Sequence, residues 1–371
     1  MNRTALLLSG GVDSSVALHR LLADGHDVTA FYLKIWLEDE LSYLGECPWE
    51  DDLAFARQVC DEAGIELRVV PLQRAYRERV VTWALDELRA GRTPSPDVLC
   101  NRVVKFGAFL DLLDDRSSGP SPDEDGRYDF VASGHYARLC REANGTTHLL
   151  RGVDLVKDQT YFLFQLRQAQ LQRVLFPIGD LHKHEVRREA ERLRLPNRTR
   201  KDSQGLCFLG KIQFARFVEA HLGEHPGPIR HVKDGTMLGE HRGHWFHTVG
   251  QRKGLGLHGG PWYVVGKALR APDRDDVIWI CHAEELADHA RNRFRLGAPH
   301  WIVGEPEPGN LSVRVRHGPK LLGARLLRAL DGLEIELEEP DPGLAPGQVA
   351  VLYRDEECLG GGSIEWHRSE P

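Results

Sequence analysis

A short glycine-rich segment near the N-terminus constrains the fold of this chain more than any other feature. An apolar run, Leu6–Leu8, is followed by Ser9, Gly10 and Gly11, and a helical pattern begins at Ser14. A strand, a glycine-rich loop and a helix in this order present backbone N–H groups and a helix N-terminus to an anion. The glycines let the backbone approach phosphate oxygens closely, and the serine hydroxyls add hydrogen-bond donors. The segment therefore predicts a phosphate-binding turn after the first strand.

This turn differs from the common P-loop, because no lysine follows the glycines as the pattern G-x-x-x-x-G-K-[ST] requires. A plain strand-to-helix turn with an N-cap serine would explain an isolated Ser-Gly-Gly. It explains the full string Ser9–Ser15 poorly.

The composition of the 371 residues, 41% hydrophobic and 28% charged, indicates a globular protein of two or three domains. No run approaches the roughly 18 apolar residues of a membrane span, and the first strand begins too early for a targeting peptide. We therefore expect a cytoplasmic protein without a membrane partner. The net charge is −7, yet residues 201–270 carry ten Lys and Arg against five Asp and Glu. This segment could be solvated surface or could bind a polyanion.

The cysteines indicate single thiols rather than a disulfide framework. They are seven in number, form no C-x-x-C pair and show no four-ligand zinc spacing: Cys47, Cys60, Cys100, Cys140, Cys207, Cys281 and Cys358.

Strand-like and helix-like segments alternate over the first two hundred residues, which predicts an α/β domain with a parallel sheet that binds ligands at the carboxyl ends of its strands. We expect strands at 4–8, 27–33, 66–71 and 129–133, and helices at 14–24, 51–63, 74–90, 103–113 and 182–193. Residues 116–127 are polar and turn-forming and predict a surface insertion.

The pattern changes after about residue 226 to short β-like runs separated by turn residues, which predicts small β-barrel modules. These runs are 245–249, 262–269, 276–281, 311–317, 321–329, 333–338 and 348–353. The predicted domains are 1–215, an α/β nucleotide-binding catalytic domain, 216–284, a small and mainly β central domain, and 285–371, a C-terminal β-barrel. The string Gly254-x-Gly256-x-x-Gly259 lacks a preceding strand, so we interpret it as a basic loop rather than a dinucleotide site.

Asp97 and Cys100 lie three residues apart on a proline-stiffened loop that leads into a helix. A thiol near a helix start is biased toward the nucleophilic thiolate. A small buried core residue is the alternative for any free cysteine. The polar neighbours Asn101 and Arg102 weaken that alternative.

Three further strings carry chemistry. Cys207 follows a glycine in a basic, turn-like context, and Gly134-His135-Tyr136 follows a predicted strand at the ligand-binding edge. Lys157-Asp158-Gln159 opens an apolar helical stretch, where Asp158 could also be only an N-terminal helix charge.

Together these strings resemble the tRNA-specific 2-thiouridylase family of ATP pyrophosphatases, enzymes that split ATP into AMP and pyrophosphate to adenylate a substrate. The resemblance extends from residue 6 to residue 362. It is carried by Ser-Gly-Gly-Val-Asp-Ser, Asp97-Val-Leu-Cys100-Asn, Gly134-His-Tyr, Lys157-Asp-Gln, Leu175-Phe-Pro-Ile-Gly, Lys201-Asp-Ser, Gly205-Leu-Cys207-Phe, Gly250-Gln-Arg-Lys-Gly-Leu-Gly, Trp262-Tyr-Val-Val, Pro346-Gly-Gln348 and Cys358-Leu-Gly-Gly-Gly362.

The resemblance implies 2-thiolation of the wobble uridine in tRNAs for Lys, Glu and Gln, with ATP and Mg²⁺ and a persulfide-donating protein partner. It implies that Cys207 carries the sulfur as a persulfide, that Cys100 resolves it, leaving a Cys100–Cys207 disulfide, and that Asp97 acts as general acid or base. It places ATP on Leu7, Leu8, Ser9, Gly10, Gly11, Val12, Asp13, Ser14, Leu33 and Gly134.

The resemblance further implies a set of tRNA contacts: Ser95, Pro96, Asp97, His135, Lys157, Asp158, Gln159, Arg316, His317 and Gln348. Ser95 stands where the family pattern has Asn, and His317 where Tyr is common, so these two contacts depart from the pattern. Cys47 could be an auxiliary thiol or a structural cysteine.

Two other functions fit parts of the sequence. A related adenylating synthetase acting on a small molecule would need no sulfur-bearing thiols. A non-catalytic RNA-binding protein would have no use for the intact Ser9–Ser15 loop.

Overall fold

The computed structural model describes residues 1–35, 49–115, 127–202, 214–269 and 275–366. Its first sheet is parallel throughout and has five strands in the order β3-β2-β1-β4-β7. The strands are β1 (Arg3–Leu7), β2 (Asp27–Lys34), β3 (Leu67–Pro71), β4 (Phe130–Ser133) and β7 (Val174–Leu175). The predicted α/β domain with a parallel sheet is confirmed.

Both faces of this sheet are buried, as its short apolar strands require. Successive residues of β1 point to opposite faces: Ala5 and Leu7 belong to one core cluster, whereas Leu6 and its neighbour Leu8 belong to the other. Three helices pack on the Leu6 side: α1 (Val12–Ala23), α3 (Trp49–Ala63) and α10 (Lys183–Arg192).

Two longer helical stretches cover the other face. The first consists of α4 (Gln73–Tyr76), a π-helical turn η2 (Arg77–Val81) and α5 (Thr82–Arg89). The second consists of α6 (Pro96–Cys100), η3 (Asn101–Ala108) and α7 (Phe109–Asp114). The second stretch begins several residues before the predicted helix 103–113, because Pro96 suits the first turn of a helix.

The central part contains a four-stranded sheet in the order β10-β11-β8-β9, preceded by α11 (Phe214–Leu222). Its strands are β8 (Gly227–His231), β9 (Met237–His241), β10 (Trp262–Ala268) and β11 (Val277–His282). The predicted strand at 245–249 is wrong. This segment starts with the short 3₁₀ turn η4 (His244–Phe246), whose aromatic rings pack against the core of the first domain instead of pairing in the sheet.

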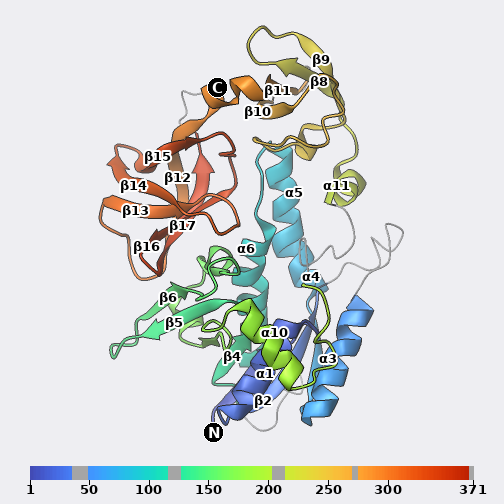
Figure 1. Cartoon of the computed structure of the whole chain (residues 1–371), viewed down its shortest axis with the longest axis vertical. Coiled ribbons are helices and arrows are strands. Elements are labelled where there is room, and N and C mark those ends of the chain that lie inside the picture. The colour runs from blue at the N-terminus through green and yellow to red at the C-terminus, as the bar shows by residue number, and fades with distance from the viewer. Residues whose placement is uncertain (36–48, 116–126, 203–213, 270–274, 367–371) are drawn as a thin grey trace.

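The C-terminal part is a closed β-barrel, as predicted (Figure 1). After the 3₁₀ segment η5 (Ala283–His289), its strands run in the order β12-β15-β14-β13-β16-β17, and pairing of β12 with β17 closes the circle. They are β12 (Arg291–Trp301), β13 (Gly309–Arg314), β14 (Leu322–Ala329), β15 (Gly332–Asp341), β16 (Val349–Arg354) and β17 (Glu357–Glu365).

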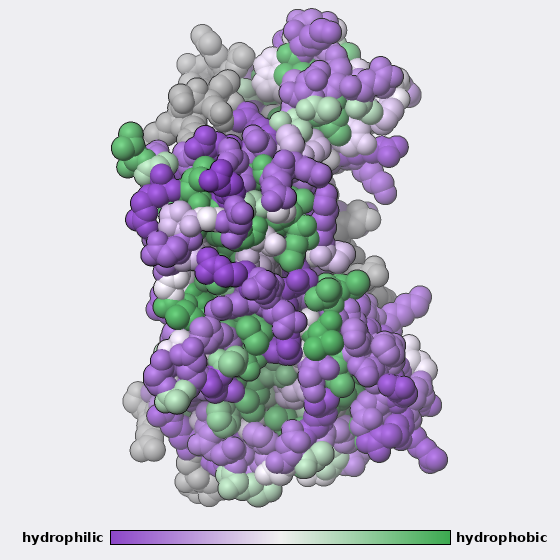
Figure 2. All heavy atoms as spheres, turned by 60° about the vertical axis from the view of Figure 1, so that its left-hand side comes forward, coloured by the Kyte–Doolittle hydropathy of each residue, from purple (hydrophilic) through white to green (hydrophobic). Residues whose placement is uncertain are grey.

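A hairpin of the first domain extends the sheet of the barrel. Strands β5 (Ala137–Arg141) and β6 (Thr147–Arg151) pair with each other, and β6 pairs with β17. This hairpin is not among the predicted strands. Two short helices, α8 (Thr160–Leu163) and α9 (Gln168–Leu171), follow it. The face that carries the barrel and hairpin is largely hydrophilic, with smaller apolar patches (Figure 2). In the part of the chain that the structure describes, no helix combines the length and apolar character of a membrane span.

A buried ion pair joins the first domain to the barrel. Arg314 of β13 donates to Asp158 Oδ2 at 2.9 Å, and both side chains are at most 1% exposed. The other Asp158 oxygen accepts from the Gly152 amide and from the Thr160 hydroxyl. Hydrogen bonds to both carboxylate oxygens offset part of the cost of burying the charge.

Replacing Asp158 with Ala is therefore expected to lower the free energy of unfolding by about 3–5 kcal/mol, because it leaves the Arg314 charge buried and uncompensated. Glu78→Gln, which breaks the exposed Arg74–Glu78 pair, is the matched control and is expected to change it by less than about 1 kcal/mol. Urea denaturation measures both values. Equal effects would show that the buried pair does not hold the two domains together.

Candidate functional site

A cavity of about 370 Å³ lies at the carboxyl ends of β1, β2 and β4, beside the N-terminus of α1. Among the predicted nucleotide-binding residues, all except Gly10 line it: Leu7, Leu8, Ser9, Gly11, Val12, Asp13, Ser14, Leu33 and Gly134. Three residues predicted to contact tRNA, His135, Lys157 and Gln159, line it as well. The structure therefore brings the two predicted groups together in one cavity.

The N-terminus of α1 presents backbone N–H groups and serine hydroxyls that can bind an anion. Gly11 is the N-cap and no side chain caps this end, so the first N–H groups of the helix have no intrahelical acceptor. The Ser9 and Ser14 hydroxyls lie 3.2 Å apart at the same end, and the Ser14 hydroxyl donates to the Gly11 carbonyl. A helix N-terminus with free amides and hydroxyls is a favourable site for a phosphate group.

Two glycines allow the backbone to close tightly around this turn. A Cβ at Gly10, where φ is +73°, would lie 2.1 Å from the carbonyl oxygen of Asp52. A Cβ at Gly134 would lie 2.7 Å from the Ser14 nitrogen. Gly10 is thus required for the shape of the turn although it does not line the cavity.

The cavity has an apolar side and a cationic side. Leu7, Phe31, Leu33 and Ile35 supply apolar surface that suits a purine ring. Lysines that suit a polyphosphate also line the cavity: Lys105, Lys157, Lys183 and Lys201. The residues present therefore fit an adenine nucleotide whose phosphates meet the N-terminus of α1.

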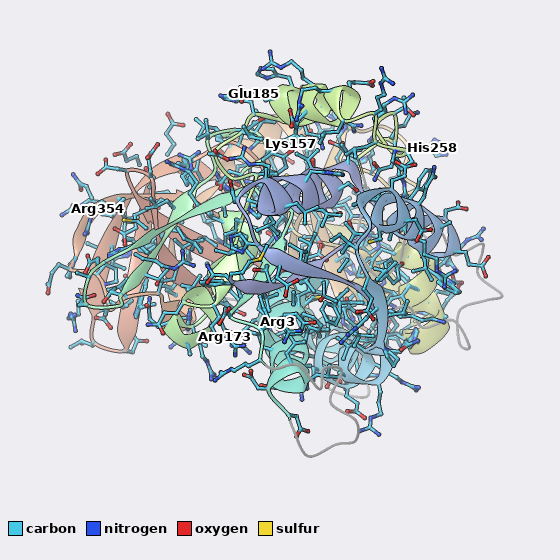
Figure 3. The ribbon with its side chains drawn as sticks, turned by 90° about the horizontal axis from the view of Figure 1, so that it is seen from below. Arg3, Lys157, Arg173, Glu185, His258 and Arg354 are labelled. Carbon is cyan, nitrogen blue, oxygen red and sulfur yellow. The ribbon has the colours of Figure 1, made fainter. Side chains whose placement is uncertain are left out.

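Lys183 is the functional candidate that the sequence analysis missed. Its ammonium group lies 2.7 Å from Asp13 Oδ1 and 2.9 Å from Asp202 Oδ1, although the lysine belongs to α10, far from the glycine-rich turn in sequence. Lys157 donates to the other Asp202 oxygen at 2.7 Å, and Figure 3 shows Lys157 between α1 and α10. Lys183 thus places a positive charge beside the glycine-rich turn, which has no lysine of its own. The one sequence signal for Lys183 is its position at the start of the predicted helix 182–193.

These contacts shift the titration of their neighbours. Burial opposes ionisation of Asp202, but hydrogen bonds from Lys157 and Lys183 outweigh it and hold the pKa of Asp202 well below its usual value. Burial and the nearby Asp13 raise the pKa of the Tyr136 hydroxyl, which donates to Asp13 at 2.8 Å. Burial, helped by Lys105, lowers the pKa of His135 to about 3. His135 is therefore neutral at physiological pH, and its ring can contact a base but supplies no charge.

Among the described residues, no group of three or more His, Cys, Asp or Glu side chains is placed to hold a metal ion. Three carboxylates line the cavity, Asp13, Asp52 and Asp202, and two of them, Asp13 and Asp202, share Lys183.

Cys100 lies inside the first turns of a long helix rather than on a loop. It ends α6, continues directly into η3, and is fully buried in the main core. The next residue, Asn101, donates from its side chain to the carbonyls of Asp97 and Phe162. Lys105, further along the same stretch, lines the cavity. The helix thus extends from the Asp97–Cys100 turn to the nucleotide-sized cavity.

Several predicted tRNA contacts gather around an aromatic cluster. The His317 ring lies 4.6 Å from the Phe162 ring and 6.2 Å from the Tyr161 ring, centroid to centroid. Ser95 hydrogen-bonds Tyr161 through its side chain. Burial and Arg314 lower the pKa of His317, with Asp97 acting in the opposite direction. This cluster brings the first domain and the barrel together beside Asp97.

The remaining predicted contacts lie in different surroundings. Asp158 is 2% exposed and bound to Arg314, so in this structure it is not a surface contact. Arg316 is half-exposed and pairs with Asp341, and the Gln348 carbonyl accepts from Ile364 within the barrel. Pro96 is buried at the start of α6. Cys207, the predicted persulfide carrier, and Cys47 lie outside the described residues.

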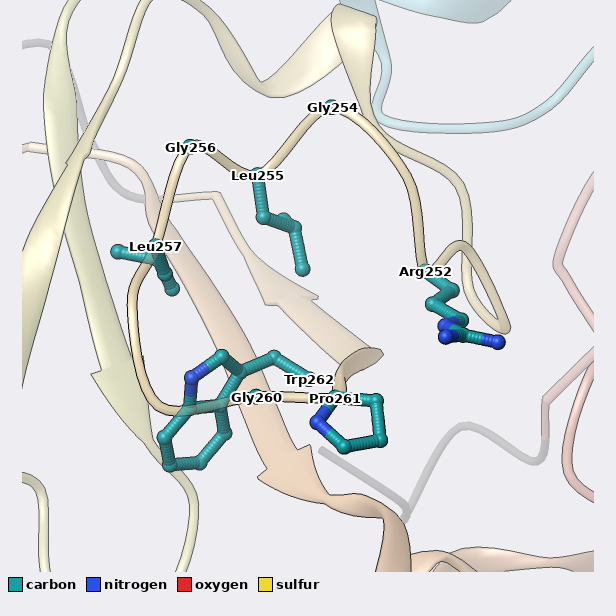
Figure 4. Close-up of a pocket in the computed structure, with 8 residues that line it drawn as sticks. All are labelled: Arg252, Gly254, Leu255, Gly256, Leu257, Gly260, Pro261 and Trp262. Atoms are coloured by element: carbon teal, nitrogen blue, oxygen red, sulfur yellow. The ribbon is translucent and has the colours of Figure 1, made fainter.

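A second pocket, also of about 370 Å³, lies in the central domain along the predicted basic loop (Figure 4). Its lining includes Arg252, three glycines of the loop and Trp262. No strand leads into the glycines, in agreement with the interpretation that this string is not a dinucleotide site.

Three family models match the chain in sequence. They are described as a tRNA methyl transferase HUP domain over residues 2–211, a tRNA methyl transferase PRC-barrel domain over 215–280 and an aminomethyltransferase beta-barrel domain over 291–364. Among solved structures, NMN synthetase from Francisella tularensis superposes with a TM-score of 0.32 at 14% identity, covering 54% of this chain and 66% of that one.

Curated relatives match over nearly the whole length. The tRNA-specific 2-thiouridylase MnmA 2 of Bacteroides fragilis is 41% identical over 367 residues, which is 97% of this chain and 99% of the relative. The tRNA-specific 2-thiouridylases MnmA of Parabacteroides distasonis and Porphyromonas gingivalis are 39% and 40% identical, each over 97% of this chain and 98% of the relative. By its cavity, its three domains and these relatives, the chain belongs to the tRNA-specific 2-thiouridylase family.

Proposed function

We propose that this protein is a tRNA-uridine 2-sulfurtransferase that uses ATP to replace O2 of the wobble uridine with sulfur. The observation that supports the proposal is that residues predicted to bind ATP and residues predicted to contact tRNA line one cavity. The helical stretch that begins at Pro96 contains Asp97 and Cys100 and extends to Lys105, which lines this cavity together with Lys157 and Gln159. ATP and the target base would therefore meet in one cavity, and Cys100, which does not line it, lies on the helical stretch that leads to it.

The chemistry requires this arrangement because the C2 carbonyl of uracil is a poor electrophile and oxide is a poor leaving group. Attack of O2 on the α-phosphate of ATP forms a C2–O–AMP ester and releases pyrophosphate. A persulfide on Cys207 then attacks C2 through its terminal sulfur, and the C2–O bond to AMP breaks. The target uridine has to leave its stack to reach the site.

Cys100 completes the transfer in this proposal. Its thiolate attacks the Cys207 sulfur, the bond from that sulfur to the transferred sulfur breaks, and a Cys100–Cys207 disulfide remains for an external dithiol to reduce. Asp97 is a candidate for the proton transfers. A persulfide-donating protein would reload Cys207.

We propose that Mg²⁺ accompanies ATP and neutralises phosphate charge together with Lys183, whose ammonium group lies between Asp13 and Asp202. Asp13 and Asp202 could hold the ion through water. We further propose that the substrates are tRNAs for Lys, Glu and Gln and that the protein works in the cytoplasm.

Reconstitution tests the proposed function directly. Purified protein, unmodified tRNA, ATP and a persulfide donor are expected to give 2-thiouridine together with AMP and pyrophosphate. ADP and inorganic phosphate as the sole nucleotide products would contradict it. AMP formation that depends on a small molecule and not on tRNA would support the alternative synthetase.

Binding of tRNA is expected to weaken steeply with salt in spite of the net charge of −7. The half-exposed Arg316 and the basic stretch 201–270 would meet phosphates, and each contact adds a slope of about −0.7 to −0.9 to the plot of log K against log salt. Filter binding at several salt concentrations measures the slope. A flat response would contradict tRNA as the substrate.

A further inference from the structure

Three domains meet at the short connection between α5 and α6, which leads directly to Asp97 and Cys100. This connection, residues 91–95, is here called the junction segment. Pro94 and Pro96 stiffen its end, because proline fixes its own φ and restricts the residue before it. A displacement at the start of the junction segment would therefore be transmitted to the Asp97–Cys100 turn.

The central domain holds the first half of the junction segment. Lys267 of β10 donates from its ammonium group to the Gly91 carbonyl at 3.1 Å. Thr93 donates from its hydroxyl to the Thr248 hydroxyl at 3.2 Å. Gly91 has φ of +74°, and a Cβ there would lie 2.7 Å from the Leu269 side chain. The segment is thus packed closely against the central domain.

The same domain also holds the end of α5. His244 lies with Nε2 3.1 Å from the Leu88 carbonyl and Nδ1 2.7 Å from Asp276 Oδ2. Both ring nitrogens of His244 thus face acceptors, one of them in the last turn of α5. The Leu88 carbonyl also accepts from the Gly91 amide. His244 and Lys267 therefore contact two successive points of the chain, the last turn of α5 and the start of the junction segment.

The barrel holds the junction segment from another side. The Thr93 amide donates to the Pro346 carbonyl at 2.8 Å. A Cβ at Gly347 would lie 2.7 Å from the Arg92 Cβ and 2.9 Å from the Thr93 nitrogen, so the barrel turn fits only without a side chain. Thr93 therefore hydrogen-bonds the barrel through its backbone amide and the central domain through its side-chain hydroxyl.

We propose that Lys267 and Thr248 are positioning residues for the reaction: by holding the junction segment, they set the place of Asp97 and Cys100 relative to the nucleotide cavity. The inference rests on the proposed function. Neither residue lines the cavity, so neither is a catalytic residue. Misplacement of reacting groups by about 1 Å can lower a rate by about 10²-fold. The central domain thus acts in catalysis and not only in RNA binding.

Lys267→Met and Thr248→Val are expected to lower kcat for thiolation about 10-fold, with the KM values for tRNA and ATP within about twofold of wild type. The melting temperature of each variant, measured alongside, separates a loss of rate from a loss of stability. Lys267→Arg and Thr248→Ser keep the donor or hydroxyl and are expected to restore most of the rate. Lys233→Met, at an exposed position of the same domain, controls for loss of charge.

A double-mutant cycle supplies the remaining test. If the Thr93–Thr248 bond is the common cause, Thr93→Val with Thr248→Val is expected to lower kcat no further than either single change. An unchanged kcat, an effect confined to KM, or an equal loss in Lys233→Met would overturn the positioning role. Absence of 2-thiouridine with the wild-type protein would instead refute the proposed function itself, so the two failures are distinguishable.

Discussion

Cys100→Ser and Cys207→Ser are each expected to eliminate 2-thiouridine formation, because the proposed transfer needs one sulfur carrier and one resolving thiol. A serine hydroxyl can neither hold a persulfide nor form the disulfide. Cys100 is fully buried, so Cys100→Ala is the second variant at that position and separates loss of the thiol from burial of a hydroxyl. Nucleoside mass spectrometry after reaction with tRNA, ATP and a persulfide donor measures the product.

The other described thiols serve as controls. Cys140 is exposed on β5, and Cys140→Ser is expected to retain full activity. Cys60, Cys281 and Cys358 are buried, and their serine variants are expected to retain thiolation with at most a loss of stability. After one turnover without reductant, peptide mapping is expected to find Cys100 joined to Cys207. Near-normal thiolation by either serine variant, or a disulfide that involves Cys47, would refute these roles.

Lys183→Met is expected to lower AMP and pyrophosphate formation by about 10²–10³-fold, the range typical for loss of one charge-stabilising donor. The ammonium group lies between Asp13 and Asp202 beside the N-terminus of α1, where the phosphates of ATP would lie. Asp13→Ala is expected to abolish turnover too, because Asp13 holds both Lys183 and the Tyr136 hydroxyl. Assays of radiolabelled AMP measure both losses.

Arg188→Met is the matched control for the lysine, since it removes a cation from the same helix α10 at a side chain that is 75% exposed. It is expected to leave AMP formation unchanged. All three variants are expected to bind tRNA with nearly wild-type affinity. If Lys183→Met instead retained AMP formation while losing tRNA affinity, the ammonium group would belong to the RNA site and not to the phosphate site.

Local sequence was sufficient to predict the glycine-rich turn between β1 and α1. Its strand, glycines and helix are consecutive in the chain, and all of the predicted residues of this turn except Gly10 line the cavity. The place of Gly134 could also be predicted from the sequence, because Gly134 follows a strand whose carboxyl end lies at the same edge of the sheet as that of β1. The turn follows from residues that are consecutive in the chain, and the place of Gly134 follows from the topology of a parallel sheet.

The place of Lys183 could not be predicted in the same way, because it arises from contacts distant in sequence. The β5–β6 hairpin does have a local signal, Asn144-Gly145 between its two strands, and only its pairing with another domain is distant in sequence. Lys183 acquires its place from the packing of α10 beside α1. The hairpin β5–β6 pairs with β17 of another domain, which no local period specifies. The segment 245–249 has the aromatic content of a strand, but tertiary packing of Trp245 and Phe246 against the first domain overrides that preference.

Nucleoside mass spectrometry of tRNA from cells that lack this protein is the decisive measurement for sulfur insertion at C2 of the wobble uridine. We expect 2-thiouridine derivatives to disappear from tRNAs for Lys, Glu and Gln. They are expected to return with the wild-type gene and not with the Cys100→Ala variant. Unchanged 2-thiouridine in the deletion strain, or loss of a methylated nucleoside in its place, would contradict the claim.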